Sequence, residues 1–157
     1  MVRLNRKIEY SLVALKYMTG KIPGELTSAK EISEKFNTPF DVTARVLQVM
    51  AQKGLLKSEQ GAMGGYYIAK DLSRVSLQDL LSMVEGPSAL VKCLQKNEAC
   101  DVQPHCNIIS PVNVLNQKLN EFYDNVKLKD LLISPNHHAS TQQIASQQSS
   151  IEVMLGK

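Results

Sequence analysis

The feature that most constrains the fold of this chain is a two-faced helix followed directly by a short hairpin. Residues 39–53 show helical periodicity, with a broad apolar arc on one side and a narrow polar stripe on the other. Two strand-like runs follow at 55–58 and 66–69, and a glycine-rich loop at 61–65 joins them. Gly54 separates the helix from the hairpin. The apolar arc comprises Val42, Val46, Leu47, Val49 and Met50, and the polar stripe comprises Asp41, Arg45, Gln48 and Gln52.

A first helix is predicted for residues 5–19, because apolar side chains recur there at helical spacing. Gly20 marks its end, and Pro23-Gly24 marks a loop. Its inward side chains should be Ile8, Leu12, Leu15 and Met18.

A second, short helix should begin after Ser28, which forms a capping box with Glu31. Thr38 is then expected to cap the helix of residues 39–53, with Pro39 at its first position. The inward side chains of the short helix should be Ile32 and Phe36.

The second half of the chain divides into three parts. Ser76 should open a short helix that ends at residues 85–87. Its inward side chains should be Leu77, Leu80, Leu81 and Val84. Residues 87–107 show little periodicity and are expected to be a loop, whereas residues 108–133 are expected to form one long dimerisation helix. Residues 134–157, rich in Gln, Ser, Asn and His, should be a flexible polar tail of open role, with a short helical turn near 151–155. The long helix carries a heptad seam of Ile108, Val112, Leu115, Leu119, Phe122 and Val126, which favours pairing with another helix.

Residues 1–86 therefore predict a winged helix-turn-helix domain, in a mainly α chain with a small two-stranded wing. Such domains place the second helix of the motif in the major groove of DNA. The polar stripe suits this use, because Arg and Gln side chains bond bidentately to guanine and adenine. The glycines of the hairpin would let main-chain N–H groups approach phosphates. The competing interpretation is a solvated helix face beside an ordinary hairpin.

Four segments resemble, in order, a family of winged-helix transcription regulators that includes IscR and NsrR: 27–36, 46–56, 61–69 and 75–86. The resemblance covers about residues 1–132 and implies a homodimeric regulator whose iron–sulfur cluster sets its affinity for double-stranded DNA. Relatives often have Arg before the wing glycine, where this chain has Gln60, and Met63 replaces a frequent glycine. The expected DNA-binding residues are Ser28, Lys30, Thr38, Asp41, Arg45, Gln48, Lys57, Gln60, Gly61, Gly64, Gly65 and Tyr66.

The three cysteines of the chain, Cys93, Cys100 and Cys106, all lie within 14 residues. Thiolates are soft ligands that suit iron–sulfur clusters and zinc. The C-x6-C-x5-C spacing lacks the C-x2-C pairs of most structural zinc sites. Three incidental surface thiols are the competing interpretation. Between these metals the spacing leaves both open, and the resemblance implies a 2Fe-2S or 4Fe-4S cluster held by these cysteines.

An iron–sulfur cluster usually has four ligands, and the chain has no fourth cysteine. Another residue must therefore complete the site. Some relatives use a histidine three residues past the last cysteine, but that position is Ile109 here. The resemblance implies an acidic ligand from the first helix of the partner subunit, and Glu9 occupies the matching position. His105 is the alternative, and His137 and His138 are poorer candidates.

Composition narrows the class of protein further. Net charge is +3, so any DNA-binding surface must be local. No apolar run of about 18 residues and no signal core are present, so a cytoplasmic protein without a membrane partner is expected. No catalytic constellation stands out, which argues against an enzyme. The expected function is sensing of nitric oxide, redox state or iron by a DNA-binding repressor. The alternatives are an iron–sulfur carrier or a thiol or zinc switch that uses the same cysteines.

Overall fold

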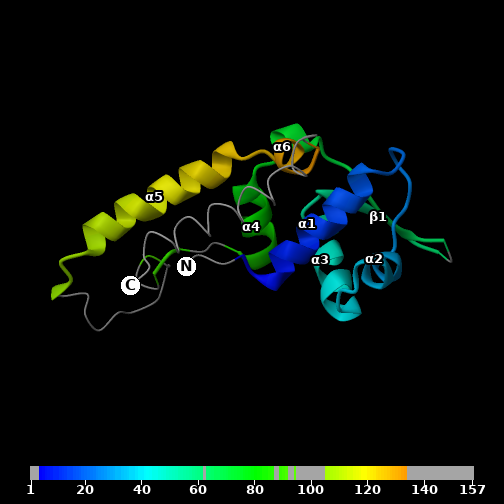
Figure 1. Cartoon of the computed structure of the whole chain (residues 1–157), viewed down its shortest axis with the longest axis horizontal. Coiled ribbons are helices and arrows are strands. Elements are labelled where there is room, and N and C mark those ends of the chain that lie inside the picture. The colour runs from blue at the N-terminus through cyan, green and yellow to red at the C-terminus, as the bar shows by residue number, and fades with distance from the viewer. Residues whose placement is uncertain (1–3, 62, 87–88, 92–93, 95–104, 134–157) are drawn as a thin grey trace, which may run out of the picture.

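The computed structural model describes residues 4–61, 63–86, 89–91, 94 and 105–133. They form a compact head and one helix that projects from it (Figure 1). We call residues 4–86 together with the last helix the head. The elements are α1 (Arg6–Thr19), α2 (Ala29–Phe36), α3 (Phe40–Gln52), β1 (Leu56–Glu59), β2 (Gly65–Ile68), the 3-10 turn η1 (Leu72–Arg74), α4 (Leu77–Glu85), α5 (Ile109–Asn125) and α6 (Leu128–Ile133). The mainly α fold with a two-stranded wing is confirmed.

Helix α1 is the central element of the head and packs against α3, α4 and α6. The Asn5 side chain caps it by accepting a hydrogen bond from the Lys7 amide, and Gly20 ends it. Leu12 is half-buried and packs against the edge of the core cluster rather than within it. The small side chains Ser11 and Ala14 are fully buried. The buried face of α1 consists of Ile8, Ser11, Ala14, Leu15 and Met18.

Helix α2 begins as expected, because Ser28 Oγ accepts a hydrogen bond of 3.1 Å from the Glu31 amide. Ile32 is fully buried. The prediction that Phe36 points inward was wrong, since this residue is 41% exposed. Phe36 is the last residue of α2, and its ring packs edge-on against the Tyr17 ring at a centroid distance of 5.4 Å.

Helix α3 begins one residue later than the cap residues suggested. Pro39, not Thr38, is its N-cap, and no side chain caps it. The Thr38 hydroxyl is instead 2.8 Å from the Thr43 hydroxyl, a buried partner inside the helix. That hydrogen bond satisfies two hydroxyl groups at once, so the side chain of Thr38 is no longer available to the helix N-terminus.

The hairpin of β1 and β2 is antiparallel, with Leu56 opposite Ile68 and Glu59 opposite Gly65. It is fixed to the segment before α2, because Thr27 and Tyr66 exchange two backbone hydrogen bonds of 2.9 Å. The wing is therefore positioned by the helix-turn-helix rather than hanging free. Both strands lie within one residue of the predicted ranges.

Helix α4 begins at a capping box in which Ser76 and Asp79 bond reciprocally. Leu77 and Leu80 are buried in the core, as expected, whereas Leu81 and Val84 are half-buried. The core cluster draws buried side chains from every element of the head except β2, whose Tyr66 and Ile68 pack against it. Its members are Ala14, Leu15, Met18, Ile32, Leu47, Met50, Leu55, Leu56, Leu72, Val75, Leu77, Leu80, Leu128 and Leu132.

The prediction of one long helix over residues 108–133 was wrong, because the chain forms two helices there. Val126 has extended backbone, and residues 126–128 bond to 75–77, with Leu77 N donating to Val126 O at 2.8 Å. Helix α6 then turns back onto the head, where Leu128 and Leu132 are buried. Burying two leucines favours this turn over a longer helix by about 1.5–3 kcal/mol for each side chain. The sequence signal was Lys129, which occupies the next seam position after Val126.

Helix α5 contacts the head mainly through α4 and projects away from it (Figure 1). None of its 17 residues is buried in the described protomer. The predicted seam is split: Val112, Leu119 and Val126 are half-buried, whereas Ile108, Leu115 and Phe122 are more than half exposed. Among the described helices, none is long and apolar enough to pass through a membrane.

Candidate functional site

The outer face of α3 is a polar surface, as its sequence pattern predicted. Asp41, Arg45, Gln48 and Gln52 are all exposed, while Val46, Leu47 and Met50 are buried on the opposite face. An exposed Arg on such a face can donate hydrogen bonds to base edges, and an exposed Gln can both donate and accept them.

The structure brings this helix face and the hairpin together around one hollow. The hollow has a volume of about 660 Å³ and lies between the C-terminal half of α3 and β1. Its polar lining comes from Gln48 and Gln52 on the helix and from Lys57, Ser58 and Tyr66 on the strands. A polar helix face and a strand that carries Lys57, sharing one concave surface, can contact bases and backbone of the same duplex.

The other expected contact residues differ in how available they are. Lys30 is exposed and lies 3.8 Å from Glu34, and Gln60 and Gly61 are exposed in the wing. Ser28 and Thr38 are half-buried, and their hydroxyl groups already bond to the Glu31 amide and to Thr43. Ser28 Oγ only accepts in its bond, so its hydroxyl hydrogen is still available to a phosphate oxygen.

The paired glycines of the wing have a structural reason that the sequence did not reveal. A Cβ atom on Gly64 would lie 2.5 Å from the Glu59 carbonyl oxygen, and one on Gly65 would lie 2.9 Å from the Thr27 carbonyl oxygen. Gly65 is also buried, so the expectation that its main chain is open to a phosphate was wrong. Close packing of the hairpin against itself and against residue 27 explains this pair.

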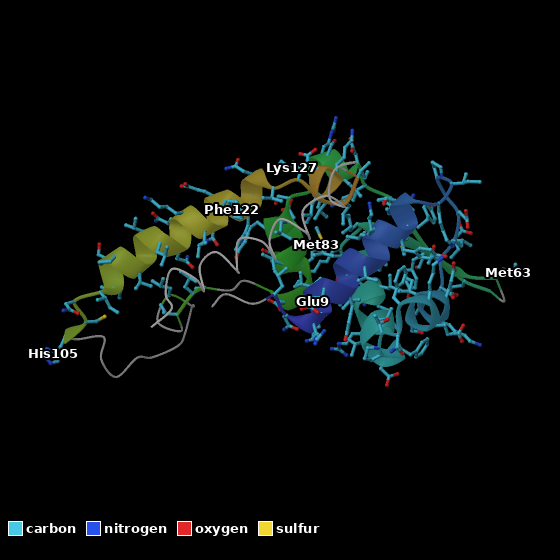
Figure 2. The ribbon with its side chains drawn as sticks, viewed as in Figure 1. Glu9, Met63, Met83, His105, Phe122 and Lys127 are labelled. Atoms are coloured by element: carbon cyan, nitrogen blue, oxygen red, sulfur yellow. The ribbon has the colours of Figure 1, made fainter. Side chains whose placement is uncertain are left out.

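Sequence reasoning missed Phe40, the first residue of α3, which is 53% exposed. Its signal was its place outside the apolar arc. An exposed aromatic side chain at the start of such a helix can contact a thymine methyl group. Met63 is still more exposed and lies at the far end of the wing (Figure 2).

A polar network joins α1 to α2, the first helix of the helix-turn-helix. The Glu31 carboxylate accepts from the Tyr17 hydroxyl at 2.6 Å and lies 2.7 Å from Lys21 Nζ. Desolvation by burial acts to raise the pKa of Glu31, but the bonds to Lys21 and Tyr17 outweigh it and lower that pKa. Desolvation likewise opposes the charge on Lys21, while Glu31 and Glu25 raise its pKa overall. The network therefore holds these charges in one arrangement.

The expected metal ligands lie in two places. Cys93 and Cys100 fall outside the described residues, whereas Cys106 is half-buried just before α5. Glu9 is in the first turn of α1, where its side chain is 42% exposed and pairs with Arg6 at 3.0 Å. Figure 2 shows Glu9 in the head and His105, beside Cys106, at the far end of α5. Within the described part of the chain, no three His, Cys, Asp or Glu side chains converge on a metal site.

Comparisons with known proteins agree on one fold. The pattern of the Rrf2 family, described as iron-dependent transcriptional regulators, matches residues 4–134. CymR, the global cysteine regulator of B. subtilis, has 22% identity and a TM-score of 0.65, covering 87% of this chain and all of its own. CymR of Staphylococcus aureus has 22% identity and a TM-score of 0.60, and the match covers 82% of this chain and 96% of that one. IscR of T. potens has 22% identity and a TM-score of 0.61, covering 87% and 90%.

Proposed function

Because the chain belongs to the Rrf2 family of DNA-binding transcription regulators, we propose that it acts as a homodimer whose DNA affinity is set by an iron–sulfur cluster. The cluster, 2Fe-2S or 4Fe-4S, is held by Cys93, Cys100 and Cys106 of one protomer and by Glu9 of its partner. Its signal is nitric oxide, redox state or iron supply.

The observation that carries the proposal is the separation, within one protomer, of Glu9 from His105, which precedes Cys106 in the sequence (Figure 2). Glu9 belongs to the head, whereas Cys106 lies at the end of α5 that points away from it. This separation favours a cluster completed between protomers over one completed within a single protomer. Pairing through α5 would carry the Cys106 end of one chain toward the head of the other.

The chemistry of the donor groups fits such a cluster. Thiolates suit iron–sulfur centres, and a carboxylate is a harder and weaker ligand for the iron. When bound, a cluster with one weak ligand supplies an iron corner that is open to reaction. Glu9 is available for this role, because its ion pair with Arg6 is exposed and such pairs contribute little to stability.

The same arrangement supplies a route from cluster to DNA. In a two-fold dimer, the two α3 helices enter successive major grooves about 34 Å apart. A bond from Glu9 to the cluster of the partner would fix the angle between the heads. Loss of that bond would free the angle and shift the population away from the DNA-competent spacing. A coupling of about 1–3 kcal/mol is enough for a regulatory change in occupancy.

On the DNA side, we assign base reading to Arg45 and Gln48 and backbone contact to Lys57 and Lys30. All four side chains are exposed, and Gln48 and Lys57 line the same hollow. Asp41, Gln60, Gly61 and Tyr66 complete the contact surface, together with Ser28 and Thr38.

The test compares Glu9→Ala with Cys100→Ala in anaerobically prepared protein. Cys100→Ala should fail to hold a stable cluster. Glu9→Ala should still assemble one, with altered visible absorption and faster loss to a chelator or to nitric oxide. Arg6→Ala is the matched control, because it breaks the same ion pair without removing a ligand.

Three outcomes would contradict the proposal. If Glu9→Ala and Arg6→Ala changed the cluster equally, the ion pair and not a ligand bond would be responsible. If His105→Ala alone changed the spectrum, the fourth ligand would be His105. Wild-type protein without visible charge-transfer bands would favour a thiol or zinc switch instead.

A further inference from the structure

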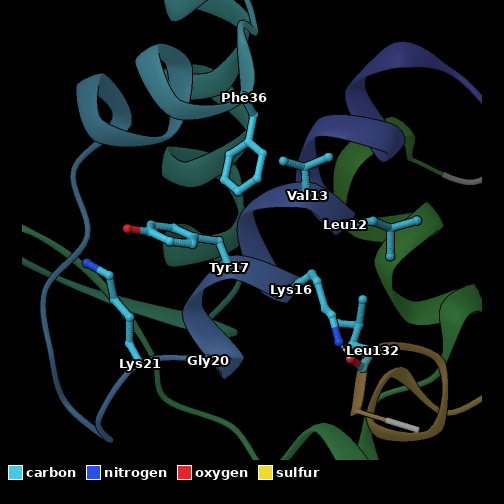
Figure 3. Close-up of a pocket in the computed structure, with 8 residues that line it drawn as sticks. All are labelled: Leu12, Val13, Lys16, Tyr17, Gly20, Lys21, Phe36 and Leu132. Carbon is cyan, nitrogen blue, oxygen red and sulfur yellow. Dashed lines mark hydrogen bonds between the residues drawn. The ribbon is translucent and has the colours of Figure 1, made fainter. Parts of the chain in front are cut away.

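The outer side of α1 carries an apolar groove that the DNA surface and the proposed cluster site do not use (Figure 3). It has a volume of about 560 Å³ and lies between α1, the end of α2 and the end of α6. Its lining includes Leu12, Val13, Lys16, Tyr17, Phe36 and Leu132.

One wall of the groove is aromatic and its rim is basic. Tyr17 and Phe36 pack edge-on, and Lys35 Nζ lies 4.6 Å from the centre of the Tyr17 ring. Lys16 donates a hydrogen bond to the Leu132 carbonyl oxygen. Among the described residues, no carboxylate forms an ion pair with Lys16 or Lys35, unlike Lys21. The groove therefore suits an apolar segment that carries a negative charge.

The chain itself contains such a segment downstream of the groove. Leu132 lines one end, and the chain continues from there into residues 134–150, which contain no Asp, Glu, Lys or Arg. Residues 151–155 then read Ile-Glu-Val-Met-Leu. Ile151, Met154 and Leu155 have the i, i+3, i+4 spacing of anchors on one helix face, and Glu152 supplies the charge.

We propose that residues 151–155 dock in the α1 groove of their own chain, with Ile151, Met154 and Leu155 against Tyr17 and Phe36. The 17 residues from 134 to 150 can span at most about 60 Å, so reach does not prevent docking. Tethering gives an effective concentration on the order of 1 mM. An intrinsic dissociation constant of about 0.1–1 mM would therefore keep the segment docked half of the time or more.

Docking would join α1, α2 and α6 through one added contact. It would reinforce the edge-on contact of Phe36 with Tyr17, beside the network that already ties α1 to α2. The proposal does not depend on the cluster or on its ligands, because none of the groove residues is among them.

The experiment is amide hydrogen exchange, followed by mass spectrometry, on the full-length protein as isolated. Residues 151–155 should exchange about 2- to 10-fold more slowly than an unprotected chain of the same sequence. Phe36→Ser should remove this protection, whereas Phe40→Ser should not, since Phe40 is a similarly exposed phenylalanine outside the groove. Ile151→Ser with Leu155→Ser should increase exchange in residues 13–20, and Ile144→Ser should leave it unchanged.

A mixed dimer tests whether residues 151–155 dock in the groove of their own chain or in that of the partner. One protomer carries Phe36→Ser with an intact 151–155 segment, and the other carries an intact groove with the mutated segment. Docking within one chain predicts no protection in this dimer. Protection there would overturn the proposal in favour of docking between copies, and unprotected 151–155 in the wild type would overturn it altogether.

Discussion

The helices of the head and helix α5 all carry apolar side chains at helical spacing, but those of the head are buried and those of α5 are not. In the head, apolar side chains from α1 to α4 and from α6 meet in one buried cluster. Helix α5 is longer than any of them, yet none of its 17 residues is buried. Most of the stability of a helix in a protein comes from packing of its apolar face. We infer that the head is complete as one protomer, whereas α5 needs a second surface.

The largest expected effect comes from breaking that second surface. Leu115 and Phe122 are 52% and 59% exposed, so Leu115→Glu with Phe122→Glu should leave the head folded. We expect sedimentation to show monomers. The affinity for a duplex selected by the wild type should fall about 100-fold or more, because two linked heads no longer bind the two half-sites of the duplex together. The control variant Asn113→Glu with Gln117→Glu adds the same charge elsewhere on α5. It should remain dimeric and keep its affinity for the duplex. Dimers in the Leu115/Phe122 variant would show that the interface lies elsewhere.

The next effect tests the completeness of the head. Leu47 is fully buried, so Leu47→Ala should lower the free energy of unfolding by about 2–5 kcal/mol. Val114→Ala on exposed α5 should change it by less than about 0.5 kcal/mol. Both are measured by urea unfolding in the Leu115→Glu, Phe122→Glu background, so that association does not contribute. Equal losses for the two variants would mean that α5 belongs to the core of one protomer.

A smaller effect separates the two kinds of contact that the head is proposed to make with DNA. Arg45→Ala should cost about 1–3 kcal/mol for the selected duplex and relax preference at one or two base pairs. Lys57→Ala should weaken all sequences alike and reduce the salt dependence of binding. Fluorescence anisotropy at several salt concentrations measures both. Equal weakening of selected and random duplexes by Arg45→Ala would remove its base-reading role.

The smallest effect concerns the network that joins α1 to α2. The pKa of Glu31 is lowered by folding, so its contribution to stability is present above the usual glutamate pKa of about 4.5 and is lost as pH falls through the lower folded value. Glu31→Gln should lower the free energy of unfolding by up to about 1 kcal/mol at pH 7. The difference from wild type should shrink in urea titrations below pH 4.5. Glu34→Gln, from the more exposed pair with Lys30, should change stability less, and a Glu31 effect independent of pH would contradict the charge argument.

The sequence by itself determined the local elements of the head. Periodicity placed α1, α3 and α4 and separated the buried face of α3 from Arg45 and Gln48, because a repeat of 3.6 residues is written directly in the chain. Glycines and strand-like runs placed the hairpin within one residue. The order of helices and hairpin, with the polar stripe, already indicated DNA binding, and the resemblance to a known family supported that function and added the expectation of a cluster.

Only the tertiary structure decided features that join distant parts of the chain. Phe36, at the end of α2, is partly exposed although its ring packs against Tyr17 of α1, and Gly65 is required by the backbone of Thr27. The heptad seam continued locally to Val126, but the chain turned there because Leu128 and Leu132 could be buried against α1 and η1. Periodicity is a property of neighbours in sequence, whereas burial depends on contacts such as that between Lys16 and Leu132, 116 residues apart.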